Sequence, residues 1–375
     1  MARRCMEARS RAACALASPT ARRRIASKDG GQAVVMARSA YGWATVAFLA
    51  ATVASAPALA QDARGPTPYL SSSAAFRDLV APSPMPPPRL RPPADERGLD
   101  LPNYSFTRFA EHVRSVPLEL ALIAATYVAI GEFNWKWGDS GFHWVKEGYF
   151  GKDTHNGGMD KLGHAWTSFL LTELLAERMQ ANSNGLSGAH VSAAIIAFGV
   201  MAAVEVGDAY TKRFGFSRQD LVADGVGVAF ALLRGAFPKL RETLDFRVTA
   251  KFGADANPLP PGVGVKSRIP AYNRQRYVLA VKGSGFDALK KTPARYLELQ
   301  FAYDTQGFHD VERRIGRKPK RNFYVGVGLN LSELLFAEGP VPNFSSYRDT
   351  ELVWAGEHLL RYVQVPYTAA HARMR

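Results

Sequence analysis

The sequence predicts an α+β protein, mainly a bundle of about four helices with a polar interior site, followed by a small antiparallel β-sheet. Apolar residues recur with a helical period of about 3.6 between residues 103 and 240, and the period changes to 2 after Asp245. A segment rich in proline comes before both parts. We therefore expect an upstream extension plus signal peptide at 1–60, a linker at 61–102, a helical domain at 103–240, and a small sheet region with a terminal helix at 241–375.

Residues 36–60 have the pattern of a secretory signal peptide. Arg38 supplies a short basic region, an apolar stretch runs from about Trp43 to Val53, and Ala58-Leu59-Ala60 forms a small-x-small cleavage site. The apolar run is short for a stop-transfer anchor, which needs about 20 residues. We expect export and cleavage after Ala60, which places the protein in the periplasm or cell envelope.

Residues 1–35 are rich in arginine and show no apolar periodicity, so we expect Met36 to be the initiator rather than Met1. Both cysteines, Cys5 and Cys14, precede Met36. The exported chain would then have no disulfide, no thiolate nucleophile, no cysteine-ligated zinc and no cysteine at the cleavage site for a lipid anchor.

Positive charge is concentrated in two segments of the chain. Residues 1–60 hold nine Arg or Lys and two Asp or Glu, which accounts for half of the net charge of +14. A second basic cluster lies between the two main strand candidates and can meet anionic lipid headgroups or polyanions, or form a solvated loop. Nucleic acid is not expected as a partner of an exported chain. The cluster consists of Arg313, Arg314, Arg317, Lys318, Lys320 and Arg321.

Residues 61–102 contain ten prolines, including Pro86-Pro87-Pro88. Proline lacks the backbone N–H that helices and sheets need, so we expect an extended linker. Such a linker can space the folded part from a membrane or a wall, or it can be disordered and without function.

Four helices are expected in the domain that follows. Ser217 lies three residues before Asp220, which is the spacing of an N-cap, and Pro238 ends the last helix. Charged residues interrupt the apolar runs, so a compact bundle, buried or membrane-associated, is favoured over a domain that spans a membrane several times. The expected helices are Val116–Glu132, Met159–Gln180, Gly188–Lys212 and Ser217–Phe237.

The residues after Asp245 alternate in polarity. Tyr296–Tyr303 and Asn322–Leu331 each place their apolar residues on one face, which predicts two half-buried strands. Phe246–Phe252 and Tyr277–Val281 are weaker candidates. We expect a small sheet packed on the helices, closed by a helix at Thr350–Tyr362.

Each of three helices carries a pair of ionisable residues: Asp160 and His164, Glu205 and Asp208, Asp220 and Asp224. Spacings of three and four residues put both members of a pair on one helix face. Charged groups are costly to bury unless they meet partners. The simplest solution is that the helices pack together and the pairs share one polar site, to which Lys161 also belongs.

Two interpretations of this site remain open. Oxygen ligands with one imidazole suit a divalent cation such as Mg, Mn, Fe or Zn, and a metal-bound water could act in hydrolysis with Glu205 or His164 as base. The metal ligands would be Asp160, His164, Glu205 and Asp220. Alternatively, nearby cations neutralise the carboxylates in a salt-bridged network that fixes the register of the helices. The candidate cations are Lys161, Lys212, Arg213 and Arg218.

Aromatic residues are dense between the first two expected helices. Trp135, Trp137, Phe142, Trp144, Tyr149 and Phe150 lie within residues 133–161. Such residues can plug the end of a bundle, line a ligand cleft or lie at a lipid–water interface.

An ordered set of motifs resembles a known family. DK-x-x-H, then an apolar helix ending in E-x-x-D, then F-S-x-x-D-L-x-x-D-G-x-G is similar to the YfiM-like family of uncharacterised bacterial envelope proteins, and more distantly to VanZ-like membrane proteins. The resemblance covers about residues 140 to 240, and the strands near 296–331 also look similar to the tail of the first family. The matching positions are Asp160, Lys161, His164, Glu205, Asp208, Ser217, Asp220 and Gly227.

This sequence departs from those patterns in two ways. Asp224 stands where the VanZ-like pattern usually has Asn, which adds a negative charge and favours a cation. Some YfiM-like members are lipoproteins, whereas no anchor cysteine follows the expected cleavage site here. The resemblance implies no reaction. We therefore expect an exported envelope protein with a structural or binding role, the alternative being a metal-dependent hydrolase acting on lipid or cell-wall precursors.

Overall fold

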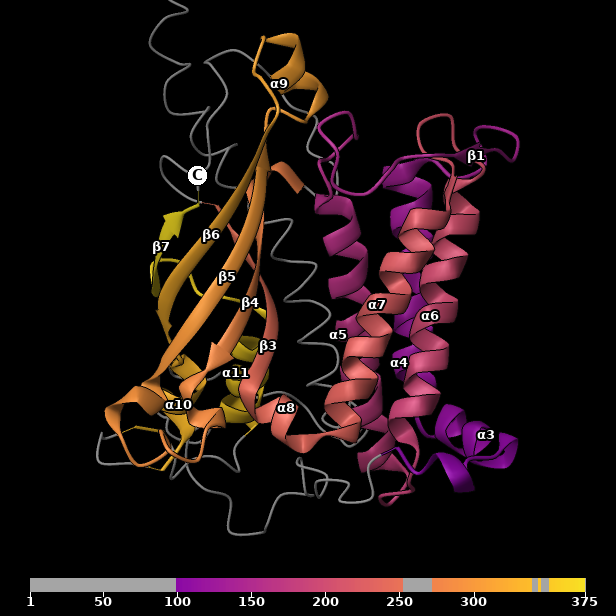
Figure 1. The fold of residues 1–375 in the computed structure, drawn as a ribbon. Helices are drawn as coiled ribbons and strands as arrows, with labels where there is room; N and C mark the ends of the chain where they lie inside the picture. The colour runs from indigo at the N-terminus through magenta and orange to yellow at the C-terminus, as the bar shows by residue number, and fades with distance from the viewer. Residues whose placement is uncertain (1–98, 252–271, 339–342, 345–350, 375) are drawn as a thin grey trace, which may run out of the picture. The chain divides into compact units, whose positions relative to one another are not determined.

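The computed structural model describes residues 99–251, 272–338, 343–344 and 351–374. The expected leader, the cleavage site and the proline-rich linker up to residue 98 lie outside the described residues. Within them, the predicted α+β class is confirmed: a group of long helices is followed by a five-stranded antiparallel sheet (Figure 1).

Helix α5 (Met159–Asn182) is the central element of the helical part. It packs against α6 (Ala189–Asp208) and α7 (Arg218–Ala236), which also contact each other. Most side chains of α5 are buried, and they lie on all sides of the helix, as expected for a helix that is surrounded by others. Helices α3 (Phe106–Ser115) and α4 (Pro117–Ile130) come earlier in the chain, and α3 contacts α5 and α6.

The four predicted helices are all present, with boundaries shifted by a few residues. Helix α4 has Pro117 in its first turn, where the missing N–H costs nothing, and continues into a π-helical turn at Gly131–Trp135. Ser217 caps α7, because its hydroxyl accepts a hydrogen bond from the Asp220 N–H at 3.2 Å. Pro238 ends α7 as predicted, but it also begins a short helix, α8 (Pro238–Thr243).

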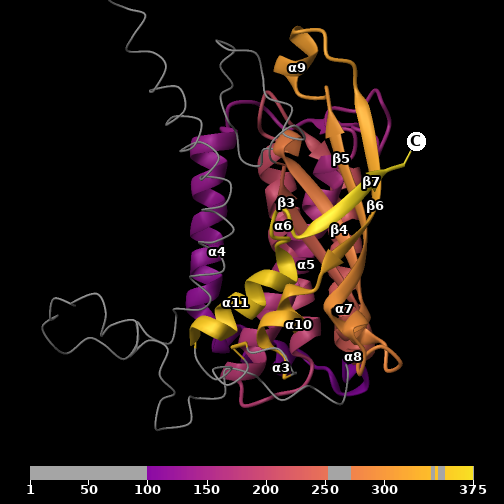
Figure 2. The ribbon, with the colours of Figure 1, turned by 90° about the vertical axis from the view of Figure 1, so that its left-hand side faces the viewer.

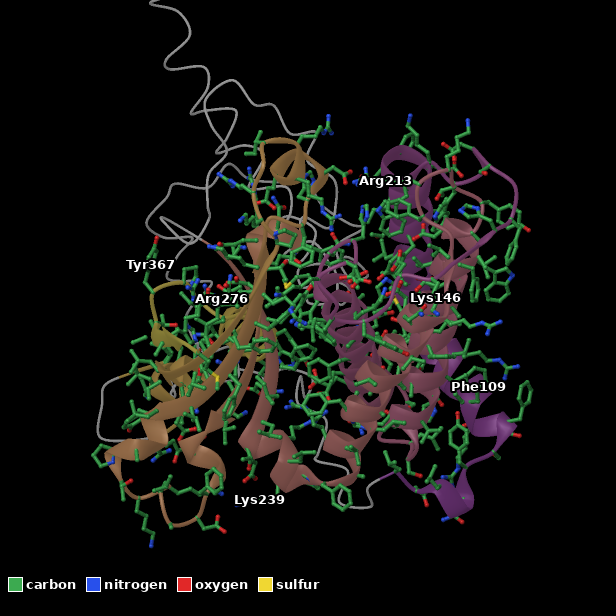
Figure 3. The ribbon with its side chains drawn as sticks, turned by 45° about the horizontal axis from the view of Figure 1, so that its top comes forward. Phe109, Lys146, Arg213, Lys239, Arg276 and Tyr367 are labelled. Carbon is green, nitrogen blue, oxygen red and sulfur yellow. The ribbon has the colours of Figure 1, made fainter. Side chains whose placement is uncertain are left out.

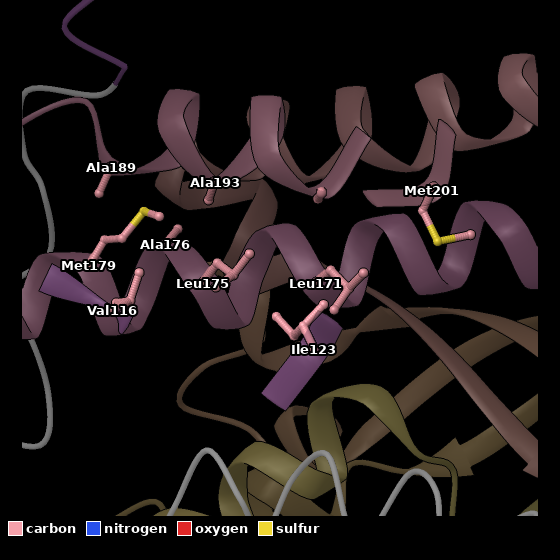
Figure 4. Packing of buried hydrophobic residues seen from close by; sticks show 10 residues of the cluster. Val116, Ile123, Leu171, Leu175, Ala176, Met179, Ala189, Ala193 and Met201 are labelled. Atoms are coloured by element: carbon pink, nitrogen blue, oxygen red, sulfur yellow. The ribbon is translucent and has the colours of Figure 1, made fainter. Parts of the chain in front are cut away.

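The helical core is formed mainly by α5 and α6. Figure 4 shows Leu175 and Met179 of α5 lying near the alanines of α6, with Val116, just before α4, and Ile123 of α4 also in the cluster. Alanines on α6 let the two helices approach closely, and each fully buried Leu or Met contributes about 1.5–3 kcal/mol. The cluster contains Leu171, Leu175, Ala176 and Met179 of α5 and Ala189, Ala193, Ala197 and Met201 of α6.

Among the described residues, α6 is the one helix that is long and apolar enough to cross a membrane by itself. Half of its apolar window is buried inside the protein, and the core helix of a soluble protein has the same composition. Residues Phe106–Ser115 and Pro117–Trp135 meet the same criterion only as a pair, and they are bent by 77° at their junction.

The sheet has the strand order β3-β4-β5-β6-β7, and every neighbouring pair is antiparallel. Four of these strands correspond to predicted ones. The fifth strand and a two-residue parallel pair, β1 (Trp144–Val145) with β2 (Phe216–Ser217), were not predicted, because such short segments carry no measurable periodicity. The strands are β3 (Leu244–Ala250), β4 (Gln275–Lys282), β5 (Leu297–Gln306), β6 (Lys320–Leu329) and β7 (Ala369–Arg373).

The alternation in β5 and β6 is present, but the buried face is the polar one. Glu298 and Gln300 are buried, whereas Leu299, Phe301 and Val327 on the opposite face are all more than 40% exposed. Each strand thus has one buried and one exposed face, as predicted, and the exposed face carries most of the apolar side chains; Tyr303, which is buried, is an exception.

Ion pairs occupy part of this buried face, beside a small apolar cluster of Val278, Ala302 and Tyr324. Arg247 contacts Asp245 at 2.7 Å and Glu298 at 2.8 Å, and Arg276, labelled in Figure 3, contacts Asp304 at 2.8 Å. The side chain of Gln364 lies over this face and bonds to Arg247. Because each of these charges meets an opposite charge, the polar face can be buried.

The apolar face of the sheet meets the helices at β3. Phe246 lies against Phe169 of α5 and Phe230 of α7, with ring centroids 6.2 and 6.5 Å away. Helix α11 (Glu351–Tyr362), predicted as the closing helix, contacts β3 and runs beside α10 (Leu331–Phe336) (Figure 2). It is joined to α5 by a contact of 2.5 Å between His358 and Glu177. Short helical turns complete the part that the structure describes: η2 (Leu101–Asn103), η5 (Tyr272–Arg274), η6 (Gly283–Gly285), η7 (Pro293–Tyr296) and α9 (Asp310–Arg314).

Candidate functional site

Ionisable side chains of α5, α6 and α7 meet at one buried point. His164 lies between the other two helices: its Nε2 is 3.7 Å from Glu205 Oε1 and 3.8 Å from Asp220 Oδ1, and its Nδ1 is 3.2 Å from Asp224 Oδ1. Glu205, Asp220 and Asp224 are all at least nine-tenths buried. The packing of the helices thus brings together at least one residue from each of the three predicted pairs.

Lys161 holds a second set of carboxylates beside the first. Its Nζ lies 2.9 Å from Asp160 Oδ2, 2.8 Å from Asp220 Oδ1 and 2.5 Å from Glu147 Oε2. Burial lowers the pKa of Lys161, but the three carboxylates outweigh this effect and hold its pKa above the ordinary value. Lys161 is therefore a fixed positive charge, and Asp220 is shared between it and His164.

Asp224 orients the imidazole of His164. Besides its contact with Nδ1, Asp224 Oδ1 accepts a hydrogen bond of 2.7 Å from the Ser168 hydroxyl. With Nδ1 directed at a carboxylate, Nε2 is left to face Glu205 and Asp220. Burial lowers the pKa of His164, but Asp220, Asp224 and Glu205 together raise it to about 10.

Glu205 is only 1% exposed, and its second oxygen is already bonded. Its Oε2 accepts a hydrogen bond of 3.0 Å from the backbone N–H of Ser217, which fixes the carboxylate at the start of α7. Burial raises the pKa of Glu205 to about 8, because the nearby His164 offsets only part of the cost of desolvation.

Asp208 has a different partner from the rest of the cluster. The indole N–H of Trp137 donates a hydrogen bond of 2.8 Å to Asp208 Oδ1. Burial raises the pKa of Asp208 to about 6, with Trp137 opposing the shift. The loop rich in aromatic residues therefore contributes directly to the polar site.

Two groups of side chains have the spacing needed to hold a metal ion. In each group the candidate ligand atoms lie within 4.8 Å of one another: His164, Glu205 and Asp220 form one, and Glu147, Asp160 and Asp220 the other. The Lys161 ammonium already contacts all three carboxylates of the second group. The first group is therefore the better candidate, and Asp160 falls outside it.

Asp220 Oδ1 belongs to this first group and is buried without a hydrogen bond. Lys161 Nζ lies 2.8 Å from this atom, so the two charges attract, but the arrangement leaves part of the oxygen's acceptor capacity unused.

Glycine residues allow the helices to approach closely beside the site. A Cβ atom on Gly227 would lie 2.0 Å from the carbonyl oxygen of Ala165, so only glycine fits at this crossing of α7 with α5. Ala165 directly follows His164, and Gly227 lies one turn after Asp224, so the crossing is next to the contact between His164 and Asp224. This explains why a glycine stands at this position in the motif D-G-x-G.

Three contributors were missed by the sequence analysis: Glu147, Trp137 and Ser168. Ser168 lies four residues after His164, so helical spacing could have found it. Glu147 and Trp137 lie in a non-periodic loop, where no spacing rule applies. The other cations that were expected have different surroundings: Arg213 lies 3.7 Å from Asp310, Arg218 lies over the Trp144 ring, and Lys212 is exposed.

Residues 146–236 match the model of a family described as predicted periplasmic lipoprotein (DUF2279). The matched segment contains α5, α6 and α7, and with them every candidate site residue except Trp137. This similarity supports an uncharacterised envelope-protein family and a location in the periplasm or envelope, and it names no activity. No curated protein and no solved structure matches the chain.

Proposed function

We propose that the helical part of this exported protein binds one divalent cation through His164 Nε2, Glu205 Oε1 and Asp220 Oδ1. The observation that carries the proposal is the separation of 3.7 and 3.8 Å between the imidazole nitrogen and the two carboxylate oxygens. These distances exceed a hydrogen bond. They are close to the roughly 3.4 Å that separates ligand atoms around an ion held at about 2.1 Å from each.

The imidazole is held as metal-bound histidines are held. In most metal sites the second ring nitrogen donates to a carboxylate, which fixes the tautomer and directs the free nitrogen at the ion. Asp224 occupies this position on Nδ1 of His164, and Ser168 fixes Asp224 in turn.

The charge balance also favours a cation. Six carboxylates, those of Glu147, Asp160, Glu205, Asp208, Asp220 and Asp224, gather around one lysine and one histidine. Even with both cations charged, the cluster is short of positive charge, and an unbalanced buried charge is costly. A divalent ion supplies the missing charge at the point where three ligand atoms converge.

The ligand set favours Mn, Fe or Zn. Imidazole nitrogen suits Fe and Zn, whereas carboxylate oxygen suits Mn and Mg, and one nitrogen with two oxygens lies between these preferences. Three protein ligands leave a coordination position open, which is the pattern of catalytic rather than structural zinc. This observation favours, as a second candidate, a metal-dependent hydrolase acting on lipid or cell-wall precursors.

The test measures metal content and stability together. Purified protein should contain about one equivalent of metal by elemental analysis, and a chelator should lower its melting temperature. Glu205→Gln should abolish both effects and leave the metal-free protein as stable as wild type or more stable, because it removes a buried negative charge. The exposed Glu132→Gln is the matched control and should behave as wild type.

The opposite result would show a salt-bridged network instead of a metal site. In that case Glu205→Gln would lower the melting temperature strongly, by the loss of about 3–5 kcal/mol typical of a broken buried pair, and chelator would have no effect on the wild type. Hydrolytic activity that is lost on chelation and restored by metal would identify the second candidate.

A further inference from the structure

The outer face of the sheet is an exposed apolar surface. Its side chains alternate with buried residues along β4, β5 and β6, and the strand register places them side by side: Leu279 pairs with Phe301, and Leu299 pairs with Val327. We call this set the outer apolar face. It consists of Leu279, Leu297, Leu299, Phe301, Phe323, Val327 and Leu329, each between 38% and 53% exposed.

This polarity is the reverse of that of a typical soluble sheet. An antiparallel sheet with one wet face normally turns its polar side chains to water and its apolar ones to the core. Here the apolar face is covered at Phe246 of β3 and at Tyr277 and Tyr303 of β4 and β5, which are buried. Further along β5 and β6 this face is open, as the exposure of Leu299 and Val327 shows. A contiguous exposed apolar surface of this kind marks an interaction site.

Basic and aromatic residues border the end of this face where β5 leads into β6. Exposed basic residues lie in and after the connection: Arg313, Arg314, Lys318, Lys320 and Arg321. Arg321 donates a hydrogen bond of 2.6 Å to the carbonyl of Phe150, and the rings of Phe150, Tyr303 and Phe323 follow one another at 5.6 and 4.7 Å. Aromatic and cationic side chains beside an apolar surface are typical of the lipid headgroup region.

We propose that the outer apolar face docks on an anionic lipid bilayer, with the basic residues of the β5–β6 connection meeting the headgroups. The chain carries a net charge of +14, half of it outside residues 1–60, so a second copy offers repulsion where anionic lipid offers attraction. The apolar face supplies affinity for any bilayer, and the basic residues supply the preference for anionic lipid. This surface is separate from the metal site.

The test uses two kinds of vesicle: phosphatidylcholine alone, and phosphatidylcholine with phosphatidylglycerol. Purified protein should cosediment with both and should bind the anionic vesicles more strongly, with a preference that salt reduces. The double variant Leu299→Thr/Phe301→Thr should weaken binding to both kinds at least about tenfold, because two large apolar contacts are lost. Threonine keeps the preference for a strand, so the fold should survive.

Two further variants separate the contributions. Lys318→Gln/Lys320→Gln should lower binding to the anionic vesicles by about fivefold for each charge and leave binding to phosphatidylcholine unchanged. Val222→Thr/Val226→Thr, which changes two exposed apolar residues of α7, is the matched control and should bind as wild type. Melting curves establish that each variant is folded.

Three results would overturn the proposal. The first is that the protein binds neither kind of vesicle. The second is equal loss of binding by the sheet variant and the α7 control. The third is a dimer in solution that dissociates in Leu299→Thr/Phe301→Thr, since the face would then be covered by a second copy.

Discussion

The Nδ1 atom of His164 lies 3.2 Å from Oδ1 of Asp224, across the crossing of α5 and α7. This contact decides where the other ring nitrogen points, and so it decides whether the site can hold a cation. Asp224 itself is fully buried, so its role can be tested without touching a surface residue.

Asp224→Asn should weaken metal binding about 10–100-fold, as loss of a partner carboxylate does in other metal sites. The metal-free protein should keep its stability, because the substitution removes one charge from an acidic cluster. Titration calorimetry with Zn²⁺ or Mn²⁺ measures the affinity. The exposed Asp153→Asn is the matched control. Unchanged affinity in Asp224→Asn would remove Asp224 from the site.

The stability of the metal-free protein should fall as the pH rises from 4.5 to about 8. Glu205 ionises near its ordinary pKa of 4.5 in the unfolded chain, but its pKa is raised to about 8 in the folded protein. The unfolded state releases the proton first, so a rising pH favours unfolding over this range.

Glu205→Gln isolates this effect. In the presence of chelator, the difference in melting temperature between Glu205→Gln and wild type should grow in favour of the variant from pH 5 to pH 8 and then level off. Added metal should shift the difference toward wild type, because only the wild type binds it. A constant difference across the range would mean that Glu205 is not held protonated.

Gly227→Ala should destabilise the protein by about 1–3 kcal/mol, because the new methyl group would overlap the Ala165 carbonyl and force the helices apart. Metal affinity should fall as well, since the same crossing positions His164 against Asp224. Urea denaturation measures the first effect and metal titration the second.

Gly225 is the matched control for this substitution. It lies two residues away on the same helix. A Cβ atom added there would have the Phe198 ring as its nearest neighbour, at 3.9 Å. Gly225→Ala should therefore stabilise α7 by about 0.5–1 kcal/mol, the usual gain of alanine over glycine in a helix. If both substitutions have the same sign, the close crossing is absent.

Glu177→Gln should release α11 from α5. Burial alone would raise the pKa of Glu177, but His358 and Arg361 outweigh it and hold the pKa well below the ordinary value of 4.5. The stabilising contribution is therefore present above pH 4.5 and is lost as the pH falls below it.

At pH 7 the substitution should cost about 3–5 kcal/mol, as expected for a broken buried pair. Near pH 3 the difference from wild type should shrink. Glu242→Gln removes an exposed carboxylate that pairs with Lys239 and Lys290, and it should cost less than about 1 kcal/mol. If the two variants lose the same free energy of unfolding, Glu177 contributes no more to stability than an ordinary surface charge.

The start and the cleavage site of the chain are tested separately. Sequencing of the envelope-fraction protein should find Gln61 at the N-terminus, and replacing Met36 should abolish the product. Residues upstream of Ala60 in the exported protein would contradict the cleavage prediction, and unchanged expression without Met36 would show that Met1 is used.

The fold class and the long elements were predictable because they depend on local periodicity. Helices α4 to α7 and strands β3 to β6 are long enough for their apolar residues to show a helical or strand period in the sequence. The N-cap at Ser217 was predictable for the same reason, since a cap concerns only the next three residues. Strand β7 has five residues and lies at the edge of the sheet, so its sequence carries too little of this pattern.

The sequence by itself determined the helix faces on which Asp160, His164, Glu205 and Asp220 lie, because spacing along a helix fixes direction. Only the tertiary structure decided their partners: Lys161 contacts Asp160, and His164 faces Glu205 and Asp220. It also decided which face of the sheet is buried. Alternation shows that a strand has two different faces, but the side that is covered depends on where the rest of the chain packs, and here the paired charges of Arg247 and Glu298 made the polar side the buried one.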